Sequence, residues 1–369
     1  MKKILLVFGT RPEAIKMCPL YIELKKSGKF DCKICLTGQH KEMLSQVMCS
    51  FGVNEDYNLN IMQEGQTISD ITVKVLEGLK VVLQNELPDL VLVHGDTTTS
   101  FAAALAAFYE KIPVGHVEAG LRTFDKYSPY PEEMNRNLTS KIADFHFSPT
   151  QNNAKNLYDE GIKENVFVTG NTVIDAFKYT IQENYIFECE ALNCINYNKK
   201  VVFVTAHRRE NLGEPLHNIF NSIKHIAQNE NVEIVYPVHM NSIIRKDVNA
   251  FLSGADNILL VEPLSVIDMH NLMSRCFMVM TDSGGLQEEA PSLGKPVLVL
   301  RNETERPEAV EAGTVKVVGT MYDDIVHEAH KLLNNIDGIY DKMAYSINPY
   351  GDGKASERIC KILNEKMNS

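Results

Sequence analysis

The stretch DLVLVH at residues 89–94 decides the fold class that this sequence predicts. Its four central residues are all apolar, and strands buried on both faces of a parallel sheet show such continuous runs. Gly95 and Asp96 follow directly, and four hydroxyl residues come next at 97–100. We therefore expect a buried strand that ends at a polar tip and leads into an alanine-rich helix at 100–109.

Short apolar runs alternate with amphipathic runs on both sides of this stretch. They predict further strands at 3–8, 32–36, 113–117, 145–148 and 166–169, and helices at 15–26, 41–51 and 69–85. A second series predicts strands at 200–205, 232–237, 258–261, 277–281 and 296–300, and helices at 216–229, 266–274, 287–293 and 322–334. Such alternation is typical of parallel sheets that are covered by helices.

Two series of this kind predict an α/β protein with two doubly wound Rossmann-like domains. We place the first domain at 1–171, the second at 172–352, and a last helix at 353–369 that crosses back to the first domain. The polar region at 183–198 should hold a helix end and a loop. Because ligands of such folds bind at the carboxyl ends of the strands, we expect the two domains to face a cleft.

The composition is that of a soluble globular protein, with 44% hydrophobic and 23% charged residues among 369. The net charge of −11 and the lack of a basic block argue against nucleic acid or an anionic membrane as the main partner. No apolar run is long enough to span a membrane. Cys32 and Cys35 should point to opposite faces of a strand. We therefore expect structural thiols in a reduced, cytoplasmic setting.

The segment GTRPEAIK at 9–16 follows the first predicted strand. Thr10 and Glu13 have the spacing of a capping box, which marks the start of a helix. Helix starts attract anions and Arg11 adds a forked phosphate donor, although a capped helix with surface charges explains the same residues. After the strand at 89–94, Asp96 could be a general base or the cap of the next helix.

The segment TDSGGLQEEA at 281–290 is the most informative strand end. Ser283 would cap a helix, and Gly284 and Gly285 would let a diphosphate approach the backbone amides. Glu289, about one turn later, could accept hydrogen bonds from ribose hydroxyls. The glycine fingerprints of P-loops and of dinucleotide-binding folds are missing from the sequence.

Two further strand ends carry charged residues. His207 and Arg208 follow the strand at 200–205 and suit a pyrophosphate, whereas a metal at His207 would lack a second ligand at the usual spacing. Residues 116–136, HVEAGLRTFDKYSPYPEEMNR, form a charged segment that is stiffened by prolines. Such a segment is either a solvated surface loop or part of a site.

Nine segments in chain order resemble the non-hydrolysing UDP-N-acetylglucosamine 2-epimerases. They are GTRPEAIKM, HGDTTT, HVEAGLRT, SPYPEEMNR, TGNTVIDA, TAHRRENLGE, TDSGGLQEEAPSLGKPVLVLR, TERPEAVEAGT and NPYGDG. The resemblance runs from the first strand to the last helix and implies the glycosyltransferase-B type of two-domain fold. It also implies reversible epimerisation of UDP-N-acetylglucosamine (UDP-GlcNAc) to UDP-N-acetylmannosamine (UDP-ManNAc) at C2, without metal or NAD. The product would supply ManNAc units for cell-surface polysaccharide, and we expect a homodimer.

The family reaction eliminates UDP in the anti sense, forms 2-acetamidoglucal, and adds UDP back with a proton on the opposite face of C2. Such a route needs cations for the leaving diphosphate and acid-base groups on both faces of C2. Resemblance assigns acid-base roles to Asp96, Glu118 and Glu132, and it makes His207 a catalytic histidine that assists at the diphosphate. It assigns substrate and UDP binding to Arg11, Lys16, Arg208, Ser283, Gly284, Gly285 and Glu289. Arg122 and Arg136 would orient the carboxylates.

Bacterial members of this family also have a regulatory site for a second UDP-GlcNAc. Its pattern is matched here by Gln39, Glu132, Arg208 and His239. Glu42 falls in the same site, but Glu42 and Gly65 stand where related members carry glutamine and arginine. The alternative functions are a hydrolysing 2-epimerase that releases ManNAc and UDP, a glycosyltransferase of the same fold, and a non-catalytic UDP-sugar-binding protein.

Overall fold

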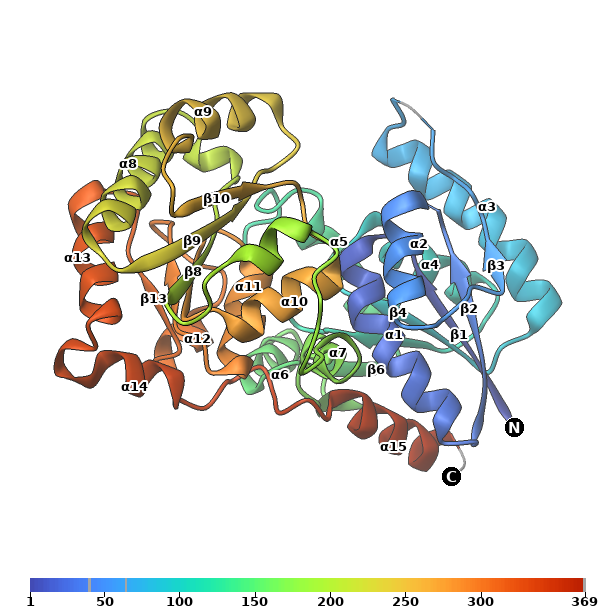
Figure 1. The fold of residues 1–369 in the computed structure, drawn as a ribbon. Helices are drawn as coiled ribbons and strands as arrows, with labels where there is room; N and C mark the ends of the chain where they lie inside the picture. Colours follow the sequence, from blue (N-terminus) through green and yellow to red (C-terminus); the bar gives the residue numbers. More distant parts are fainter. Residues whose placement is uncertain (39–40, 64, 368–369) are drawn as a thin grey trace. The chain divides into compact units, whose positions relative to one another are not determined.

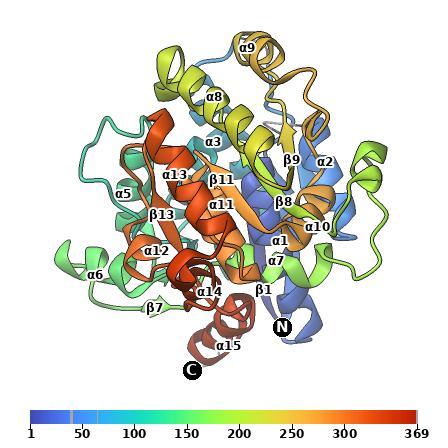
Figure 2. The same ribbon diagram turned by 60° about the vertical axis from the view of Figure 1, so that its left-hand side comes forward.

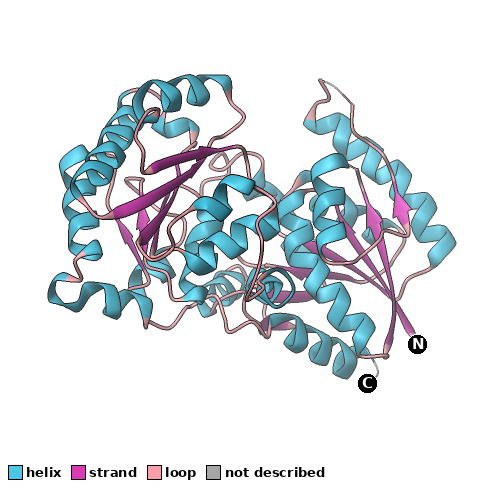
Figure 3. Cartoon of the chain, viewed as in Figure 1, coloured by secondary structure: helices cyan, strands magenta, loops and turns pink. Residues whose placement is uncertain are grey.

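The computed structural model describes residues 1–38, 41–63 and 65–367, and the side chains of residues 41–43 are outside this description. The chain divides into two compact units. Unit 1 holds Met1–Tyr179 and Tyr350–Ser369, and unit 2 holds Thr180–Pro349. Each unit contains a parallel sheet with helices on it (Figures 1 and 3), so the predicted α/β class with two doubly wound parts is confirmed.

The described sheet of unit 1 has the strand order β3-β2-β1-β4-β5-β6-β7, and neighbouring strands are parallel. The strands are β1 (Lys2–Phe8), β2 (Phe30–Leu36), β3 (Tyr57–Asn58), β4 (Leu90–His94), β5 (Val114–Val117), β6 (Phe145–Ser148) and β7 (Val166–Val168). The predicted strand at 89–94 is β4, which is buried along its whole length between β1 and β5. Only β3 escaped prediction in this sheet, because its two residues form no apolar run.

Helices of unit 1 connect these strands. They are α1 (Arg11–Lys26), α2 (Lys41–Ser50), α3 (Ile68–Glu86), α4 (Thr98–Tyr109), α5 (Glu132–Ile142), α6 (Gln151–Asp159), α7 (Thr172–Thr180) and α15 (Ala355–Met367). The last helix, α15, packs against α1 (Figure 1). The sequence predicted α1 to α4 and α15, but α5, α6 and α7 were not predicted.

The longest of these helices, α3, shows why the apolar pattern works as a predictor. Ile71, Val75 and Leu79 recur every fourth residue and are buried, so they form one apolar face. Thr67 caps the helix start by accepting a hydrogen bond from the backbone N–H of Asp70. The buried face packs against α4, whose alanines allow a close approach of the two helices.

The described sheet of unit 2 has the order β10-β9-β8-β11-β12-β13 and is also parallel. Its strands are β8 (Lys200–Thr205), β9 (Val232–Pro237), β10 (Ile258–Val261), β11 (Met278–Thr281), β12 (Val297–Val299) and β13 (Val315–Val317). Its α-helices are α8 (Glu214–Asn229), α9 (Ser242–Leu252), α10 (Val266–Arg275), α11 (Gly284–Glu289), α12 (Pro307–Glu311), α13 (Tyr322–Leu333) and α14 (Ile339–Ala344). Helices α8 and α13 lie side by side (Figure 2).

Two expectations for unit 2 were wrong in detail. The polar region at 183–198 holds no end of an α-helix, because α7 stops at Thr180 and a short 3-10 turn, Glu190–Cys194, is the regular element there. The helix predicted at 287–293 starts earlier, at Gly284, and continues beyond Glu289 as a 3-10 turn. The earlier start places both glycines of the TDSGG segment inside the first turn of α11.

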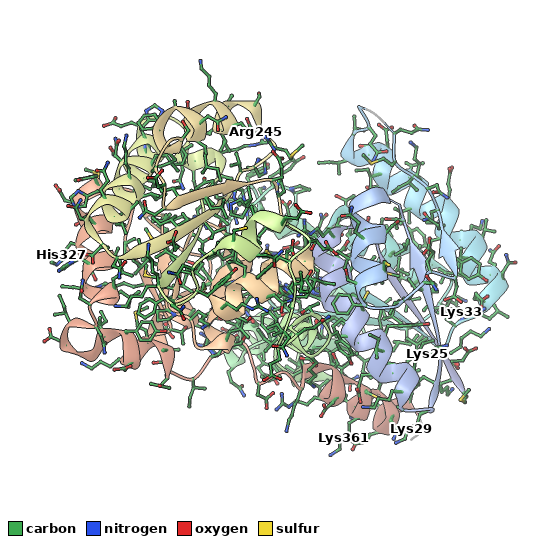
Figure 4. The ribbon with its side chains drawn as sticks, viewed as in Figure 1. Lys25, Lys29, Lys33, Arg245, His327 and Lys361 are labelled. Atoms are coloured by element: carbon green, nitrogen blue, oxygen red, sulfur yellow. The ribbon has the colours of Figure 1, made fainter. Side chains whose placement is uncertain are left out.

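Cys32 and Cys35 lie in β2 and are buried. Burial raises the pKa of both thiols to about 12, so they stay protonated and unreactive. The burial of Cys32 and Cys35 agrees with the expectation that this pair is structural, whereas Cys49 and Cys194 are exposed. Figure 4 labels cationic side chains on separate helices, with Lys25 on α1, Arg245 on α9 and Lys361 on α15.

None of the described helices combines the length and apolarity that a membrane crossing needs.

Candidate active site

Glu118 follows β5 and is tightly constrained. Its backbone φ is +65°, a conformation that residues with a side chain rarely adopt and that other contacts must hold. Its Oε1 accepts hydrogen bonds from the Nζ of Lys16 and, at 2.9 Å, from the Nδ2 of Asn171. Its Oε2 lies 3.4 Å from the Nε2 of His94. Residues from three parts of unit 1 therefore fix the orientation of this carboxylate.

The histidines beside Glu118 are neutral. His94 ends β4 and is buried, and burial lowers its pKa to about 4 despite the neighbouring Glu118 carboxylate. His116 in β5 is also buried, with a pKa lowered to about 3, and its Nε2 donates to the backbone oxygen of Gly95 at 2.7 Å. These rings shape the ends of two adjacent strands without adding positive charge near Glu118.

Asp96 lies at the end of β4, next to Glu118. Its Oδ2 accepts a hydrogen bond from the Nη2 of Arg136 at 2.6 Å. Burial raises the pKa of Asp96 to about 6, although the Arg136 guanidinium acts in the opposite direction, and the charges of Glu118 and Glu132 raise it further. The cap of α4 is Thr97. The capping alternative for Asp96 is therefore excluded, and its carboxylate is available for acid-base chemistry.

Two charged residues of the 116–136 segment were expected to orient carboxylates, and they behave differently. Arg136 contacts the candidate carboxylate Asp96, as described above. Arg122 instead binds Glu160 through two hydrogen bonds of 2.5 and 2.8 Å, so its predicted role was wrong. Glu132 is the first residue of α5 and is half-buried. It stands one helical turn before Arg136, on the side of α5 that faces Asp96.

The predicted capping box at the start of α1 is confirmed. The Oε2 of Glu13 accepts from the backbone N–H groups of Gly9 at 3.0 Å and Thr10 at 2.8 Å. Its Oε1 accepts from the hydroxyls of Thr97 at 2.7 Å and Ser100 at 2.9 Å. Glu13 thus joins the ends of β1 and β4, a role that the sequence did not reveal.

The two phosphate ligands predicted on α1 lie in its first two turns. Arg11 is the first residue of the helix, where the backbone amides favour an anion. Lys16 forms an ion pair with Glu118. In the structure Lys16 therefore contacts a candidate acid-base carboxylate.

Asp282 organises the candidate nucleotide site of unit 2. It directly follows β11 and has no solvent exposure. Its Oδ2 accepts hydrogen bonds from the backbone N–H groups of His207 and Arg208, both at 2.7 Å, and from the Nδ2 of Asn211 at 3.1 Å. Its Oδ1 lies 3.6 Å from the Nδ1 of His207. One buried carboxylate therefore anchors the loop that follows β8.

The ring of His207 stacks on the ring of His239, with centroids 4.9 Å apart and planes inclined by 5°. The Nδ1 of His239 accepts the backbone N–H of Asn241 at 3.1 Å, so its other nitrogen carries the proton when the ring is neutral. Burial lowers the pKa of His207, Asp282 acts in the opposite direction, and His239 and Arg208 lower it further. His207 is therefore a neutral, oriented imidazole at neutral pH.

The start of α11 is lined by cations. A Cβ atom on Gly284 would lie 3.8 Å from an Nη2 atom of both Arg208 and Arg306. Ser283 occupies the N-cap position, but its hydroxyl does not cap the helix. The first amides of α11 and two guanidinium groups thus converge on one point, which suits a diphosphate.

Arg306 was not among the predicted site residues. It follows β12 and also pairs with the buried Glu288, so the sequence offered only its position after a strand as a signal. Glu289 is buried, and its Oε1 would lie 3.3 Å from a Cβ atom on Gly285. A side chain at position 285 would press on this carboxylate, which explains the glycine.

The residues matched to a regulatory site are only partly described. Gln39 lies outside the described residues, and so does the side chain of Glu42. Gly65 lies in a turn with φ of +72°. Glu132 belongs to unit 1, whereas Arg208 and His239 belong to unit 2. The structure brings the last two together through His207, which Arg208 follows in the chain and His239 stacks on.

The structure thus gathers most predicted site residues into two groups, one in each unit. Unit 1 brings together Lys16, Asp96, Glu118 and Glu132, and unit 2 brings together His207, Arg208, Ser283, Gly284, Gly285 and Glu289. The first group offers carboxylates that can take and return a proton, one with a pKa near neutrality. The second offers cations and amides for a diphosphate, and a carboxylate for hydroxyl groups.

Comparison with known proteins gives the chain a family. The family model described as UDP-N-acetylglucosamine 2-epimerase matches residues 22–364. The UDP-N-acetylglucosamine 2-epimerase of Bacillus subtilis is 52% identical over 363 residues, which cover 98% of this chain and 94% of that protein. The enzyme of the same name from Salmonella typhimurium is 51% identical over 372 residues, covering 98% of both chains.

Solved structures agree with this comparison. The crystal structure of the Neisseria meningitidis UDP-GlcNAc 2-epimerase bound to UDP-GlcNAc has 50% sequence identity and a TM-score of 0.91, covering 98% of this chain and all of that one. A Streptomyces glycosyltransferase, at 12% identity and a TM-score of 0.53, shares the fold alone. The expected glycosyltransferase-B type of fold is thereby confirmed. The chain belongs to the UDP-N-acetylglucosamine 2-epimerase family.

Proposed function

We propose that this protein interconverts UDP-GlcNAc and UDP-ManNAc by eliminating and re-adding UDP, without release of free sugar. The observation that carries the proposal is the pair Asp96 and Glu118, two carboxylates at the ends of adjacent strands, one of them with a pKa raised to about 6. Proton transfer at carbon is efficient when the pKa of the acid-base group lies near the working pH.

Chemistry explains why more than one carboxylate is needed. The C2 hydrogen has no neighbouring carbonyl, so it becomes acidic only as the C1–O bond to UDP breaks. A carboxylate then takes the C2 proton, a C1–C2 double bond forms, and UDP carries away the bonding electrons. Addition of UDP reverses these steps, and a proton delivered to the other face inverts C2. Asp96, Glu118 and Glu132 are our candidates for the two faces.

Unit 2 would bind the leaving group. Arg208, the amides at the start of α11 and the neutral His207 suit the diphosphate, whose negative charge grows as the C1–O bond breaks. Glu289 would accept hydrogen bonds from the ribose. In unit 1, Arg11 would add a further phosphate contact. We also propose that Lys16, which pairs with Glu118, contacts the diphosphate when substrate is bound.

Deuterium labelling tests the proposal directly. The protein is incubated with UDP-GlcNAc in D₂O, and the products are followed by NMR. We expect UDP-ManNAc with deuterium at C2, and deuterium also appearing in the remaining UDP-GlcNAc because the reaction is reversible. Product without deuterium would contradict the elimination. Accumulation of free ManNAc and UDP would favour the hydrolysing alternative, and unchanged UDP-GlcNAc would favour a glycosyltransferase or a binding protein.

The pKa of Asp96 predicts a pH dependence. Below about pH 6 its carboxylate is protonated, so it cannot accept a proton and it loses its charge interaction with Arg136. We therefore expect kcat/KM to fall as the pH drops through about 6, and this limb to be absent in Asp96→Asn. The measurement is a pH profile of both proteins from about pH 5 to about pH 8, a range that brackets the pKa of Asp96. An acidic limb of equal shape in the variant would contradict the assignment.

We also propose a homodimer that is built on the apolar outer face of α3 and α4. Val73 and Val81 on α3 and Phe108 and Tyr109 on α4 are exposed, and the last two are 59% and 64% accessible. Large apolar patches on soluble proteins usually mark an interface. The two helices pack together, so these side chains belong to one region of unit 1.

Light scattering after size exclusion tests this interface. We expect twice the chain mass of 41.5 kDa for the natural protein and a single chain mass for Phe108→Glu. The control is Tyr345→Glu, which adds the same charge at a residue that is 85% exposed on unit 2. A natural protein that runs as a monomer, or a control that dissociates as readily, would rule out the proposed interface.

We also propose substrate activation and a cytoplasmic location for this protein. A second UDP-GlcNAc would act as an activator, and the match of Arg208 and His239 supports this, while the replacements at Glu42 and Gly65 predict weaker activation. The eight free cysteines support a cytoplasmic location, where thiols stay reduced. There the product would feed the synthesis of cell-surface polysaccharide.

A further inference from the structure

His270 contacts the candidate nucleotide site from the protein interior. It lies on α10 with no solvent exposure. Its Nε2 is 3.4 Å from the Oε2 of Glu289, and its Nδ1 is 2.7 Å from the Oγ1 of Thr180. The contact to Glu289 comes from a residue 19 positions earlier in the chain, in a different helix, and no sequence motif marked it.

The two contacts select one tautomer of the His270 ring. A neutral imidazole donates through one nitrogen and accepts through the other. If Nδ1 carried the proton, the lone pair of Nε2 would face the negative Oε2 of Glu289. With the Thr180 hydroxyl donating to Nδ1, the proton sits on Nε2, 3.4 Å from the Oε2 of Glu289. At this separation the contact with the carboxylate is electrostatic and is not a hydrogen bond.

Thr180 is held in place by the same helix. The residue after His270, Asn271, donates from its Nδ2 to the backbone oxygen of Thr180 at 2.7 Å. The Oδ1 of Asn271 accepts the backbone N–H of Gln182 at 3.0 Å. Thr180, His270 and Asn271 are all fully buried. The hydroxyl that orders the His270 ring is thus fixed, and so is the ring.

The other carboxylate oxygen of Glu289 points to the start of α11. Its position is 3.3 Å from where a Cβ atom on Gly285 would lie, close to the amides that suit the diphosphate. The Oε2 of Glu289 is buried 3.4 Å from the His270 ring and accepts no hydrogen bond within the described residues, so Oε1 is the oxygen that is left for a ligand. A carboxylate held in this way loses less conformational freedom when a ligand binds.

We propose that His270 is a positioning residue for ribose recognition: through the electrostatic attraction between its Nε2–H and the Oε2 of Glu289, it orients Glu289 so that the other carboxylate oxygen meets a hydroxyl group of the bound nucleoside diphosphate. The proposal rests on the proposed function, which places UDP on unit 2. It adds a specific claim, namely that His270 governs how strongly the protein distinguishes UDP from a deoxy analogue, and not how well the protein folds.

Calorimetric titration with UDP, 2′-deoxy-UDP and 3′-deoxy-UDP tests this claim on the full-length protein. Loss of a hydrogen bond to a charged group should weaken binding of one deoxy analogue by about 10- to 100-fold in the natural protein. The two variants form a matched pair. The amide nitrogen of His270→Gln can reach the place of Nε2, whereas that of His270→Asn can reach only the place of Nδ1.

We expect His270→Gln to keep most of the preference for UDP over the deoxy analogue. His270→Asn should bind UDP and the deoxy analogue with affinities within about threefold of each other. UDP affinity in His270→Asn should approach that of the natural protein for the deoxy analogue, with the melting temperature recorded for each variant. Thr180→Val, which removes the hydroxyl that orders the ring, should lie between the two.

The outcomes separate this inference from the proposed function. A natural protein that does not bind UDP would overturn the nucleotide assignment itself. One that binds UDP and both deoxy analogues equally would overturn ribose recognition by Glu289, and with it this inference. A natural protein that prefers UDP, with His270→Asn keeping the same preference, would overturn the role of His270 alone. Equal losses for UDP and deoxy-UDP in both variants would show a purely structural role and would also overturn it.

Discussion

Replacing Glu118 with glutamine is expected to lower kcat by about 10²- to 10⁴-fold, the usual contribution of a positioned acid-base group. The amide has nearly the same shape, and its oxygen can still accept hydrogen bonds from Lys16 and Asn171. It cannot take up a proton from C2. The affinity for UDP should stay within about threefold, because the proposed ligands of UDP, Lys16 among them, keep their side chains.

Initial rates with UDP-GlcNAc and calorimetric titration with UDP measure the two effects. Glu164→Gln, at an exposed position of unit 1, is the matched control and should leave both unchanged. Asn171→Ala should give an intermediate loss of kcat, since it removes one of the contacts that orient Glu118. Turnover at the natural rate in Glu118→Gln would remove this residue from the mechanism. A parallel loss of UDP affinity would instead make Glu118 a binding residue.

Replacing Asp282 with alanine is expected to destabilise unit 2 by about 3 kcal/mol or more, because each buried donor left without an acceptor costs about 1–3 kcal/mol. The Oδ2 of Asp282 accepts from three donors in the loop that carries His207 and Arg208. The same change should weaken UDP binding, since the loop loses its anchor next to β11.

Urea unfolding followed by circular dichroism measures the change in stability, and titration with UDP measures the loss of binding. Asp256→Ala is the control, because Asp256 is an exposed aspartate of the same unit. Asp282→Asn keeps one acceptor oxygen and should fall between the natural protein and Asp282→Ala. An unfolding midpoint of Asp282→Ala that matches the control would show that the three hydrogen bonds do not hold the loop.

The sheets were predictable from the sequence because their strands are continuous apolar runs. The run at 89–94 became β4, and the runs at 200–205 and 258–261 became β8 and β10 with the same bounds or nearly so. Helix α9 was not predicted, although Asn241 caps it and its buried residues Ile244, Val248 and Leu252 recur every fourth position. Helix α5 was not predicted because Pro129 and Pro131, just before it, favour a loop in the sequence pattern.

The contacts that shape the candidate site were not predictable, because they join distant residues. Asn171 and Glu118 are 53 positions apart, and Asp282 and His207 are 75 positions apart. A single sequence shows which residues follow strands, but it does not show which strand ends meet. The positive φ of Glu118 is equally hidden, since the residue type gives no sign of it.

The cations at the start of α11 have a consequence for the kinetics of association. The protein carries a net charge of −11, so at long range it repels a nucleoside diphosphate. Arg208 and Arg306 attract the same ligand only at short range. At physiological salt, charges separated by more than about 8 Å are screened, so the repulsion fades while the local attraction persists. The association rate constant of UDP should therefore rise with added salt at first and decline only when the salt begins to screen the two arginines.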